Sequence, residues 1–254
     1  MRNKTLKLLV LFPLLLGLPL FANTSELKVA IANDAPPYVA DNAKSGLEVE
    51  IIQQALPGYS IKFLQMGWGD IQNAIKNGIA DAETNVYEHG EAGGHYFSNN
   101  YVGFVNYAIS RKSEDIKIDN VNDLVGHHVI AWKGAHLDLG PEFERLFSPG
   151  GAGSKNYVEI QDSRDQVRDF WKNEDSIAII DKSIFTHFSM NQGHSMDEVD
   201  THKVFLPVSK FKMAFKDEKT RDEFNKGLAR LCSTGEYAKL LRKHGIQEKA
   251  NICE

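Results

Sequence analysis

The alternation of strand-like and helix-like segments from residue 27 onward constrains the fold of this chain more than any other feature. Segments rich in strand formers are separated by segments whose apolar residues recur at helical spacing. The expected strands are 27–32, 59–64 and 79–82, and the expected helices are 47–56 and 69–76. A β-α-β-α-β order predicts a parallel sheet with crossover helices, and hence an α/β fold.

A second unit of similar design follows the first. Its expected strands are 104–110, 127–132, 158–160 and 177–180, its expected helices are 121–124, 134–146 and 164–171, and the chain closes with strands 204–208 and 212–215 and two amphipathic helices. Crossings between the units are expected near 109–113 and 206–211, and two adjacent crossings make a hinge. We therefore predict lobe one as 26–110 plus 208–254 and lobe two as 111–207. Ligands of open α/β sheets bind where strands end, so the predicted site is the cleft between the lobes.

The first residues predict a secretory leader. Three basic residues precede an apolar run, 8–21, which is broken by prolines and a glycine and ends at the small residue Ala22. The alternative is a membrane anchor, but the run is short for a spanning helix. We therefore expect residues 1–22 to be a signal peptide and the mature protein to lie in the periplasm.

The charge balance excludes some partners. Lys and Arg number 29 against 34 Asp and Glu, and the predicted leader holds three of the basic residues, so its removal changes the formal net charge from −5 to −8. An acidic domain without a basic cluster is a poor partner for phosphate backbones or anionic lipid. We expect no binding to nucleic acid.

The chain has two cysteines, Cys232 and Cys253, both near its end. In an oxidising compartment an isolated pair usually forms a disulfide, which here would fasten the C-terminal tail. A redox-active pair is the alternative, but the spacing is far from Cys-x-x-Cys.

Short motifs spread along nearly all of the mature chain together resemble one protein family. They are Pro36-Pro37-Tyr38, Gly46-Leu47-Glu48-Val49-Glu50, Trp68, Asn77-Gly78-Ile79-Ala80-Asp81, Phe97-Ser98 with Tyr101, Leu124-Val125-Gly126-His127-His128-Val129, Gly134, Ile180-Asp181, Phe224-Asn225-Lys226-Gly227 and Gly235-Glu236-Tyr237. The chain resembles family 3 of the extracytoplasmic solute-binding proteins, the polar amino-acid type. The resemblance implies a two-lobed periplasmic-binding-protein-like clamshell of type II with two hinge crossovers. It also implies binding of a small solute without catalysis or a cofactor.

The resemblance implies roles for two residues and shows one departure. In the family an aromatic residue at the place of Trp68 lies over the ligand, and an aspartate at the place of Asp181 takes the α-amino group. An arginine shortly before the Phe97-Ser98 pair takes the α-carboxylate, because a planar guanidinium suits it. Here residues 83–95 contain no arginine or lysine, and the segment is about two residues shorter than usual.

The remaining candidate ligand residues are mostly acidic or aromatic. They are Asp34, Tyr38, Trp68, Glu83, Thr84, Trp132 and Asp181, with Lys133 as a possible partner for an anionic group. Acidic groups and indole faces favour a cation or an amine. We therefore expect a nitrogenous solute, cationic or zwitterionic.

Structural alternatives exist for several of these residues. Trp68 and Trp132 could pack in a core, and Asp181 could cap the helix that follows it, a role compatible with ligand contact. Glu83 and Thr84 could be ordinary loop residues.

We expect no metal site. His127 and His128 are adjacent in a strand and point to opposite faces, and His89, Glu91 and His95 lack an evident fourth ligand.

Three functions are compatible with the resemblance. The first is a monomeric periplasmic receptor that delivers its solute to a membrane ABC permease. The second is a sensor that acts in trans on a membrane receptor. The third is an enzyme like the cyclohexadienyl dehydratases, which the missing arginine disfavours because that chemistry acts on a carboxylated substrate.

Overall fold

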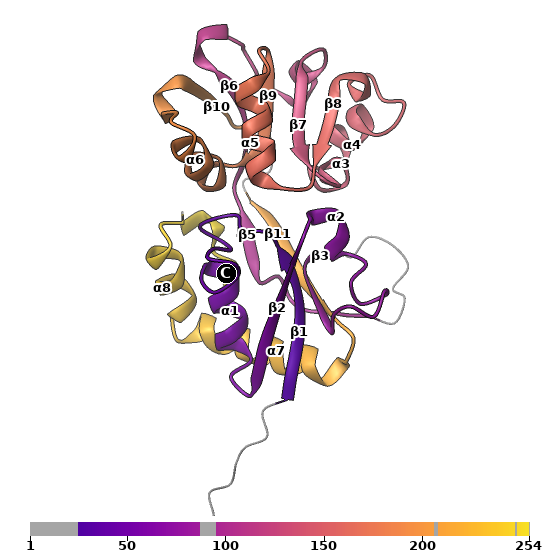
Figure 1. Ribbon diagram of the computed structural model, residues 1–254, viewed down its shortest axis with the longest axis vertical. Helices are drawn as coiled ribbons and strands as arrows, with labels where there is room; N and C mark the ends of the chain where they lie inside the picture. The colour runs from indigo at the N-terminus through magenta and orange to yellow at the C-terminus, as the bar shows by residue number, and fades with distance from the viewer. Residues whose placement is uncertain (1–24, 87–94, 206–207, 247, 254) are drawn as a thin grey trace, which may run out of the picture.

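The computed structural model describes residues 25–86, 95–205, 208–246 and 248–253. The chain forms two lobes, one above the other, each built on its own sheet (Figure 1). The predicted leader, residues 1–22, lies outside the described residues. No helix in the described part of the chain has both the length and the apolar character needed to span a bilayer.

Lobe one contains a six-stranded sheet in the order β2-β1-β3-β11-β4, with β5 paired to β11. Its strands are β1 (Ser25–Ala32), β2 (Tyr59–Met66), β3 (Ala82–Val86), β4 (Tyr96–Phe97), β5 (Val102–Phe104) and β11 (Ser209–Phe215). Strand β1 is parallel to β2 and β3, as the β-α-β-α-β order predicts. Strand β11 returns from lobe two and runs antiparallel to β3, β4 and β5.

The helices of lobe one are α1 (Leu47–Ala55), α2 (Trp68–Ile71), α7 (Glu218–Ser233) and α8 (Glu236–Lys243), with a 3-10 turn η5 (Glu248–Ala250). The predicted helix over 69–76 is only the short α2. Beyond Ile71 the chain continues in tight turns closed by i to i+3 hydrogen bonds, such as Ala74 N to Ile71 O at 3.0 Å. Ala74 and Ile75 are still buried. The apolar spacing over residues 69–76 therefore predicted correctly which side chains are buried, although the segment is not a regular helix.

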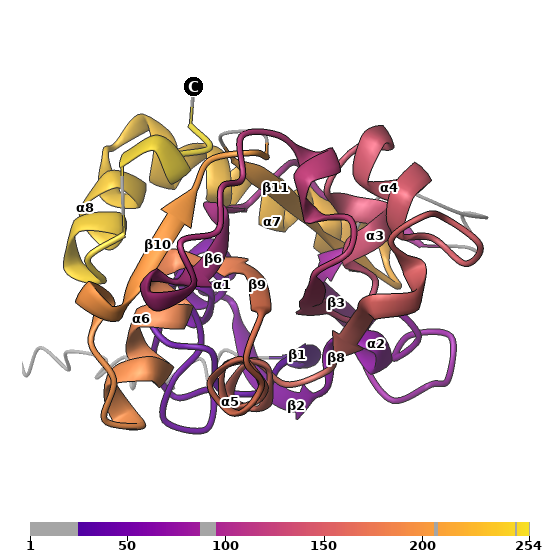
Figure 2. The same ribbon diagram turned by 90° about the horizontal axis from the view of Figure 1, so that it is seen from above.

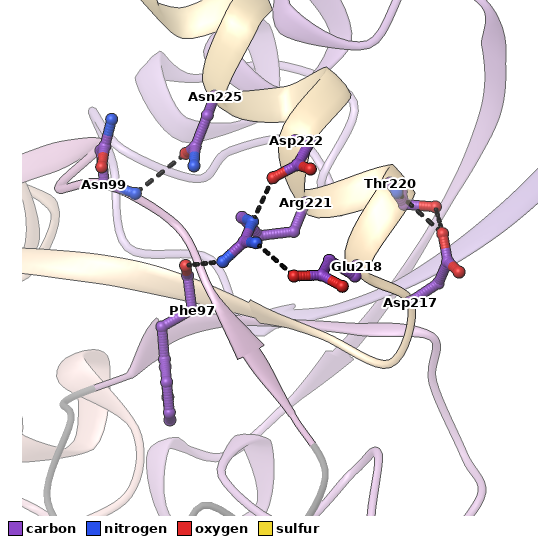
Figure 3. A network of polar contacts seen from close by, with 8 residues as sticks. All are labelled: Phe97, Asn99, Asp217, Glu218, Thr220, Arg221, Asp222 and Asn225. Atoms are coloured by element: carbon purple, nitrogen blue, oxygen red, sulfur yellow. Dashed lines mark hydrogen bonds and ion pairs between the residues drawn. The ribbon is translucent and has the colours of Figure 1, made fainter.

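Helix α7 is fastened to the segment that leads into β5 (Figure 3). Asp217 caps the helix by accepting from Thr220 N at 2.7 Å. Arg221 Nη1 donates to the Phe97 carbonyl at 3.2 Å, and Asn99 N donates to Asn225 Oδ1 at 2.9 Å. These contacts hold the 96–101 segment in place below the cleft.

Lobe two contains a five-stranded sheet in the order β10-β6-β9-β7-β8. Its strands are β6 (Asn106–Arg111), β7 (His128–Trp132), β8 (Tyr157–Ile160), β9 (Ser176–Asp181) and β10 (Val199–His202), and its helices are α3 (Ala135–Asp138), α4 (Pro141–Phe147), α5 (Ser163–Lys172) and α6 (Lys182–Asn191). Four 3-10 turns complete it: η1 (Lys112–Glu114), η2 (Val121–Leu124), η3 (Ser154–Asn156) and η4 (Met196–Glu198). Helix α6 lies at one end of the lobe and α3 and α4 lie at the other (Figure 2).

The predicted helix over 134–146 is two helices. Gly140 adopts a φ of 97°, and Pro141 follows it at the first position of α4. Proline has no backbone N–H to continue α3, and its fixed φ suits a helix start.

The two crossovers lie side by side. The first is Val105, between β5 and β6, and the second follows β10, where residues 206–207 lie outside the described part. Strand β6 pairs with β9 and β10, so the sheet of lobe two already begins at Asn106, whereas the sequence prediction assigned 106–110 to lobe one. The chain stays extended through the crossing, so residue type gives no signal where it changes sheets. We keep the division into 26–110 plus 208–254 and 111–207 as a proposal, with this shift at its first boundary.

One buried apolar cluster runs through both lobes. It includes Leu47 and Phe224 in lobe one, Ile180 and Phe185 in lobe two, and Phe104 next to the crossing. The predicted pairing of Cys232 and Cys253 is confirmed, since the two are joined by a disulfide that fastens the tail to α7.

Candidate functional site

Hydrogen bonds join the two lobes around the cleft. Among them are those from Tyr38 Oη to Asp181 Oδ2 (3.0 Å), from Trp68 N to Gln161 O (3.2 Å) and from Asn33 Nδ2 to Asp162 Oδ2 (3.3 Å). The Gln161 side chain of lobe two packs against Gly67 of lobe one, and a Cβ atom added to Gly67 would lie 2.2 Å from Gln161 Oε1. The two lobes are therefore closed onto each other.

A cavity of about 340 Å³, part of it open to solvent, lies between the lobes. It is lined by Trp68, Phe104 and Phe211 from lobe one and by Asn106, Trp132, Ser163, Gln166, Ile180, Asp181 and Ile184 from lobe two. Trp132 and Asp181 are the last residues of β7 and β9, and Ser163 is the first residue of α5. The cavity thus occupies the place where ligands of open α/β sheets bind, beyond the carboxyl ends of the strands.

Aromatic rings form much of the cavity wall. Trp68 meets Phe104 edge-on with ring centroids 6.2 Å apart. Trp132 is 8% exposed, and its indole N–H donates to Asp138 Oδ2 at 3.1 Å, so Trp132 offers the cavity its ring rather than its donor. Both tryptophans also pack against buried apolar clusters. For these two residues, core packing and a place at the cavity coexist.

Asp181 is held by four donors from the protein. Oδ1 accepts from the backbone N–H groups of Ser183 (2.8 Å) and Ile184 (3.3 Å), which makes Asp181 the N-cap of α6. Oδ2 accepts from Val105 N at 2.8 Å and from the Tyr38 hydroxyl. Burial raises the pKa of Asp181, and these hydrogen bonds act against that rise. The capping role is therefore present, and its contact with a ligand stays a prediction.

Gln166 is a polar residue of the cavity that the sequence analysis missed. It is 1% exposed, and its Nε2 donates to the Ile130 carbonyl at 3.2 Å and to the Ile179 carbonyl at 2.9 Å. None of the described residues donates to Oε1, so the amide is turned with its acceptor available to a ligand. Gln166 lies four residues before Phe170, on the buried face of α5, and a polar residue on that face was the signal that could have indicated this role.

Four further lining residues were also missed: Phe104, Asn106, Ser163 and Phe211. Asn106 Nδ2 donates to Ser209 Oγ at 3.0 Å and so ties β6 to β11 at the crossovers. These four come from segments far apart in the sequence, and only the closed arrangement of the lobes brings them together.

Asp34 and Tyr38 lie outside the cavity lining. Asp34 accepts from Gln65 Nε2 at 2.7 Å and lines a different groove, together with Arg164 and His187 of lobe two. Tyr38 is fully buried and contacts the cavity only through Asp181 and Phe104, whose ring centroid is 4.2 Å from its own.

Glu83, Thr84 and Lys133 do not line the cavity either. Glu83 is buried in β3 and accepts from Ile75 N at 2.8 Å, and burial raises its pKa. Thr84 is fully buried beside it. Lys133 is half exposed and forms an ion pair with Glu159 at 3.2 Å. Ligand binding by these residues remains a prediction.

No three His, Cys, Asp or Glu side chains come together as metal ligands within the described residues. His89 and Glu91, which were considered above as metal ligands together with His95, lie outside the described residues.

Two lobes, two adjacent crossovers and a cavity between them define a solute-binding clamshell. The chain belongs to family 3 of the bacterial extracellular solute-binding proteins, whose family model matches residues 27–247. A search of curated proteins found no significant match.

Solved structures of several binding proteins are similar to this chain. A histidine kinase sensor domain similar to periplasmic binding proteins has a TM-score of 0.72 at 19% identity, covering 87% of this chain and 96% of its own. An ABC uptake transporter substrate-binding protein from Streptococcus pneumoniae with bound histidine has a TM-score of 0.71 at 15% identity, covering 89% and 94%. The amino-acid ABC transporter protein AbpA from the same organism, bound to L-arginine, has a TM-score of 0.68 at 18% identity, covering 88% and 97%. At these identities the likeness shows the fold.

Proposed function

We propose that this protein binds a small nitrogenous solute, cationic or zwitterionic and amino-acid-like, in the periplasm and delivers it to a membrane ABC permease. The observation that carries the proposal is the composition of the cavity. Among the residues that the structure describes, two indole rings and a buried aspartate line it, and no basic side chain does. Such a wall attracts positive charge through the carboxylate and through the faces of the rings.

Binding would be coupled to closure of the lobes. Trp68 comes from lobe one, and Trp132 and Asp181 come from lobe two, so a solute in the cavity touches both. Only the closed form offers all of these contacts at once, and a ligand favours the state to which it binds better. A permease that recognises the closed form would then receive loaded protein.

The proposed compartment and partner rest on the family and on the transporter proteins among the similar structures. The predicted leader fits a periplasmic location. We propose a monomer that binds its solute without changing it chemically.

A second candidate function is a sensor that reports its solute to a membrane receptor in trans. The histidine kinase sensor domain among the similar structures favours it. The two roles differ in their consequence: loss of an importer protein abolishes solute uptake, whereas loss of a sensor changes transcription while uptake continues.

A thermal-shift screen of the mature protein tests the proposal, because a solute that binds the folded form raises its melting temperature. The screen should contain amines, basic, neutral and acidic amino acids, and dicarboxylates. We expect stabilisation by nitrogenous cations or zwitterions. Stabilisation by dicarboxylates alone would contradict the proposal.

A further inference from the structure

Within the described part of the chain, no basic side chain lines the cavity. Lys133 is engaged with Glu159, and Arg164 lies over the Phe188 ring, 5.7 Å from its centroid, in the other groove. A carboxylate buried without a positive partner loses its hydration and gains little in return.

The N-termini of α5 and α6 are already occupied by carboxylates of the chain itself. A helix N-terminus is the usual place for an anion, because its first N–H groups have no partner within the helix. In α5 the Asp162 side chain accepts from Arg164 N at 2.9 Å and Asp165 N at 3.4 Å. In α6 Asp181 takes the equivalent N–H groups. The two caps fill the anion sites and add negative charge beside the cavity.

The cavity offers the hydrogen-bond acceptors of Gln166 and Asp181, beside the Ser163 hydroxyl and the Asn106 amide. Gln166 uses both of its amide hydrogens on the Ile130 and Ile179 carbonyls, which leaves Oε1 as an acceptor. Asp181 contributes a carboxylate in the cavity wall. A solute that pairs with Gln166 Oε1 donates a hydrogen bond, and a positive charge on it would offset the buried negative charge of Asp181.

The size of the cavity restricts the solute further. The space of about 340 Å³ includes open solvent, so the room enclosed between the closed lobes is small and favours a compact solute. Trp68 and Trp132 supply aromatic faces on which a cation can lie.

From these four observations we infer that the solute is a compact organic cation, an amine or a guanidine, that carries N–H donors and no carboxylate. Gln166 Oε1 accepts from it, and the charge of Asp181 selects its sign. The inference rests on the proposed function and narrows it. Amino acids should bind weakly, and the corresponding amines without a carboxylate should bind tightly.

Isothermal titration of the mature protein with matched pairs tests the inference. The pairs are agmatine and arginine, putrescine and ornithine, and histamine and histidine, which differ in each case by one carboxylate. In at least one pair we expect the amine to bind about 100-fold more tightly than the amino acid, since an unpaired buried charge costs several kcal/mol. The inference is overturned if no amine binds more tightly than its amino acid.

The same titrations separate the inference from the proposed function. Tight binding of an amino acid overturns the inference and leaves a nitrogenous solute in place. Failure of every nitrogenous compound, with stabilisation by a dicarboxylate in the thermal-shift screen, overturns both.

A variant tests the role assigned to Gln166. Gln166→Leu should weaken binding of the preferred amine about tenfold or more, because the cavity loses an acceptor. Gln53→Leu, at an exposed glutamine of α1, is the control and should bind as the unchanged protein does. Circular dichroism confirms that each variant folds. If Gln166→Leu does not fold, the comparison of matched pairs still decides the question, because it uses the unchanged protein.

Discussion

The hydroxyl of Tyr38 in lobe one donates a hydrogen bond to the Asp181 carboxylate in lobe two at 3.0 Å. Both side chains are buried, and Asp181 is also the cap of α6. One phenol therefore links the lobes and the cavity wall.

Removing this hydroxyl should weaken closure. In Tyr38→Phe the buried Asp181 loses one of its donors, so we expect the free energy of unfolding to fall by about 1–3 kcal/mol and the protein without solute to become more open. Small-angle scattering measures the opening and urea titration measures the stability. Tyr237→Phe is the control, because the Tyr237 hydroxyl donates to the Tyr101 carbonyl within lobe one at 3.0 Å. An equal increase in the radius of gyration of both variants would show that the Tyr38 hydroxyl does not hold the lobes closed.

Trp68 should contribute a large share of solute affinity. In Trp68→Ala the cavity loses its main lobe-one ring, and we expect the Kd of the preferred solute to rise about 30-fold or more. Titration calorimetry measures it. Trp171→Ala is the control: Trp171 stacks on His194 at 3.7 Å and does not line the cavity, so its loss should lower stability and leave the Kd unchanged. Equal Kd values for both variants and the wild-type protein would show that Trp68 does not contribute to solute binding.

Glu48 should make stability fall as pH rises. Burial raises the pKa of Glu48 from 4.5 to about 7, although Tyr101 and Asn85 donate to it. The folded protein then holds a proton that the unfolded chain releases. Its stabilising effect is complete below about pH 4.5 and is lost as pH rises to about 7, with a total of up to about 3 kcal/mol.

Urea denaturation between pH 4.5 and 8 measures this dependence on pH. In Glu48→Gln the group no longer titrates, so the stability curve should be flatter across that window. If the free energy of unfolding of Glu48→Gln changed with pH as steeply as that of the wild-type protein, the pH dependence would come from other groups.

Gly227 should be required for the contact between α1 and α7. A Cβ atom at Gly227 would lie 2.0 Å from the Ala55 carbonyl oxygen, so Gly227→Ala forces the two helices apart. We expect a loss of about 1–3 kcal/mol in the free energy of unfolding. Gly58→Ala is the control, because that Cβ would meet no atom within 4 Å. Equal urea midpoints for the two variants would contradict this account.

The α/β order, the parallel core of lobe one, the two-lobed fold and the disulfide could all be predicted from the sequence. The sheet change at Val105 and the break between α3 and α4 could not. For the site, Trp68, Trp132 and Asp181 do line the cavity, whereas Asp34 lines another groove and Glu83 is buried in β3. A candidate residue near the end of a strand is therefore not necessarily turned toward the cleft.

The sequence by itself determined which segments form strands and helices, because apolar periodicity and the positions of glycine and proline act locally. It also determined that residues 83–95 lack the arginine that the family uses for a carboxylate. Only the tertiary structure decided which side chains line the cavity. Gln166 acquires its orientation from the carbonyls of two different strands, and Asp181 acquires its donors from a helix, a crossover and the opposite lobe. Such contacts join residues far apart in the chain, and their geometry exists only when both lobes are folded and closed.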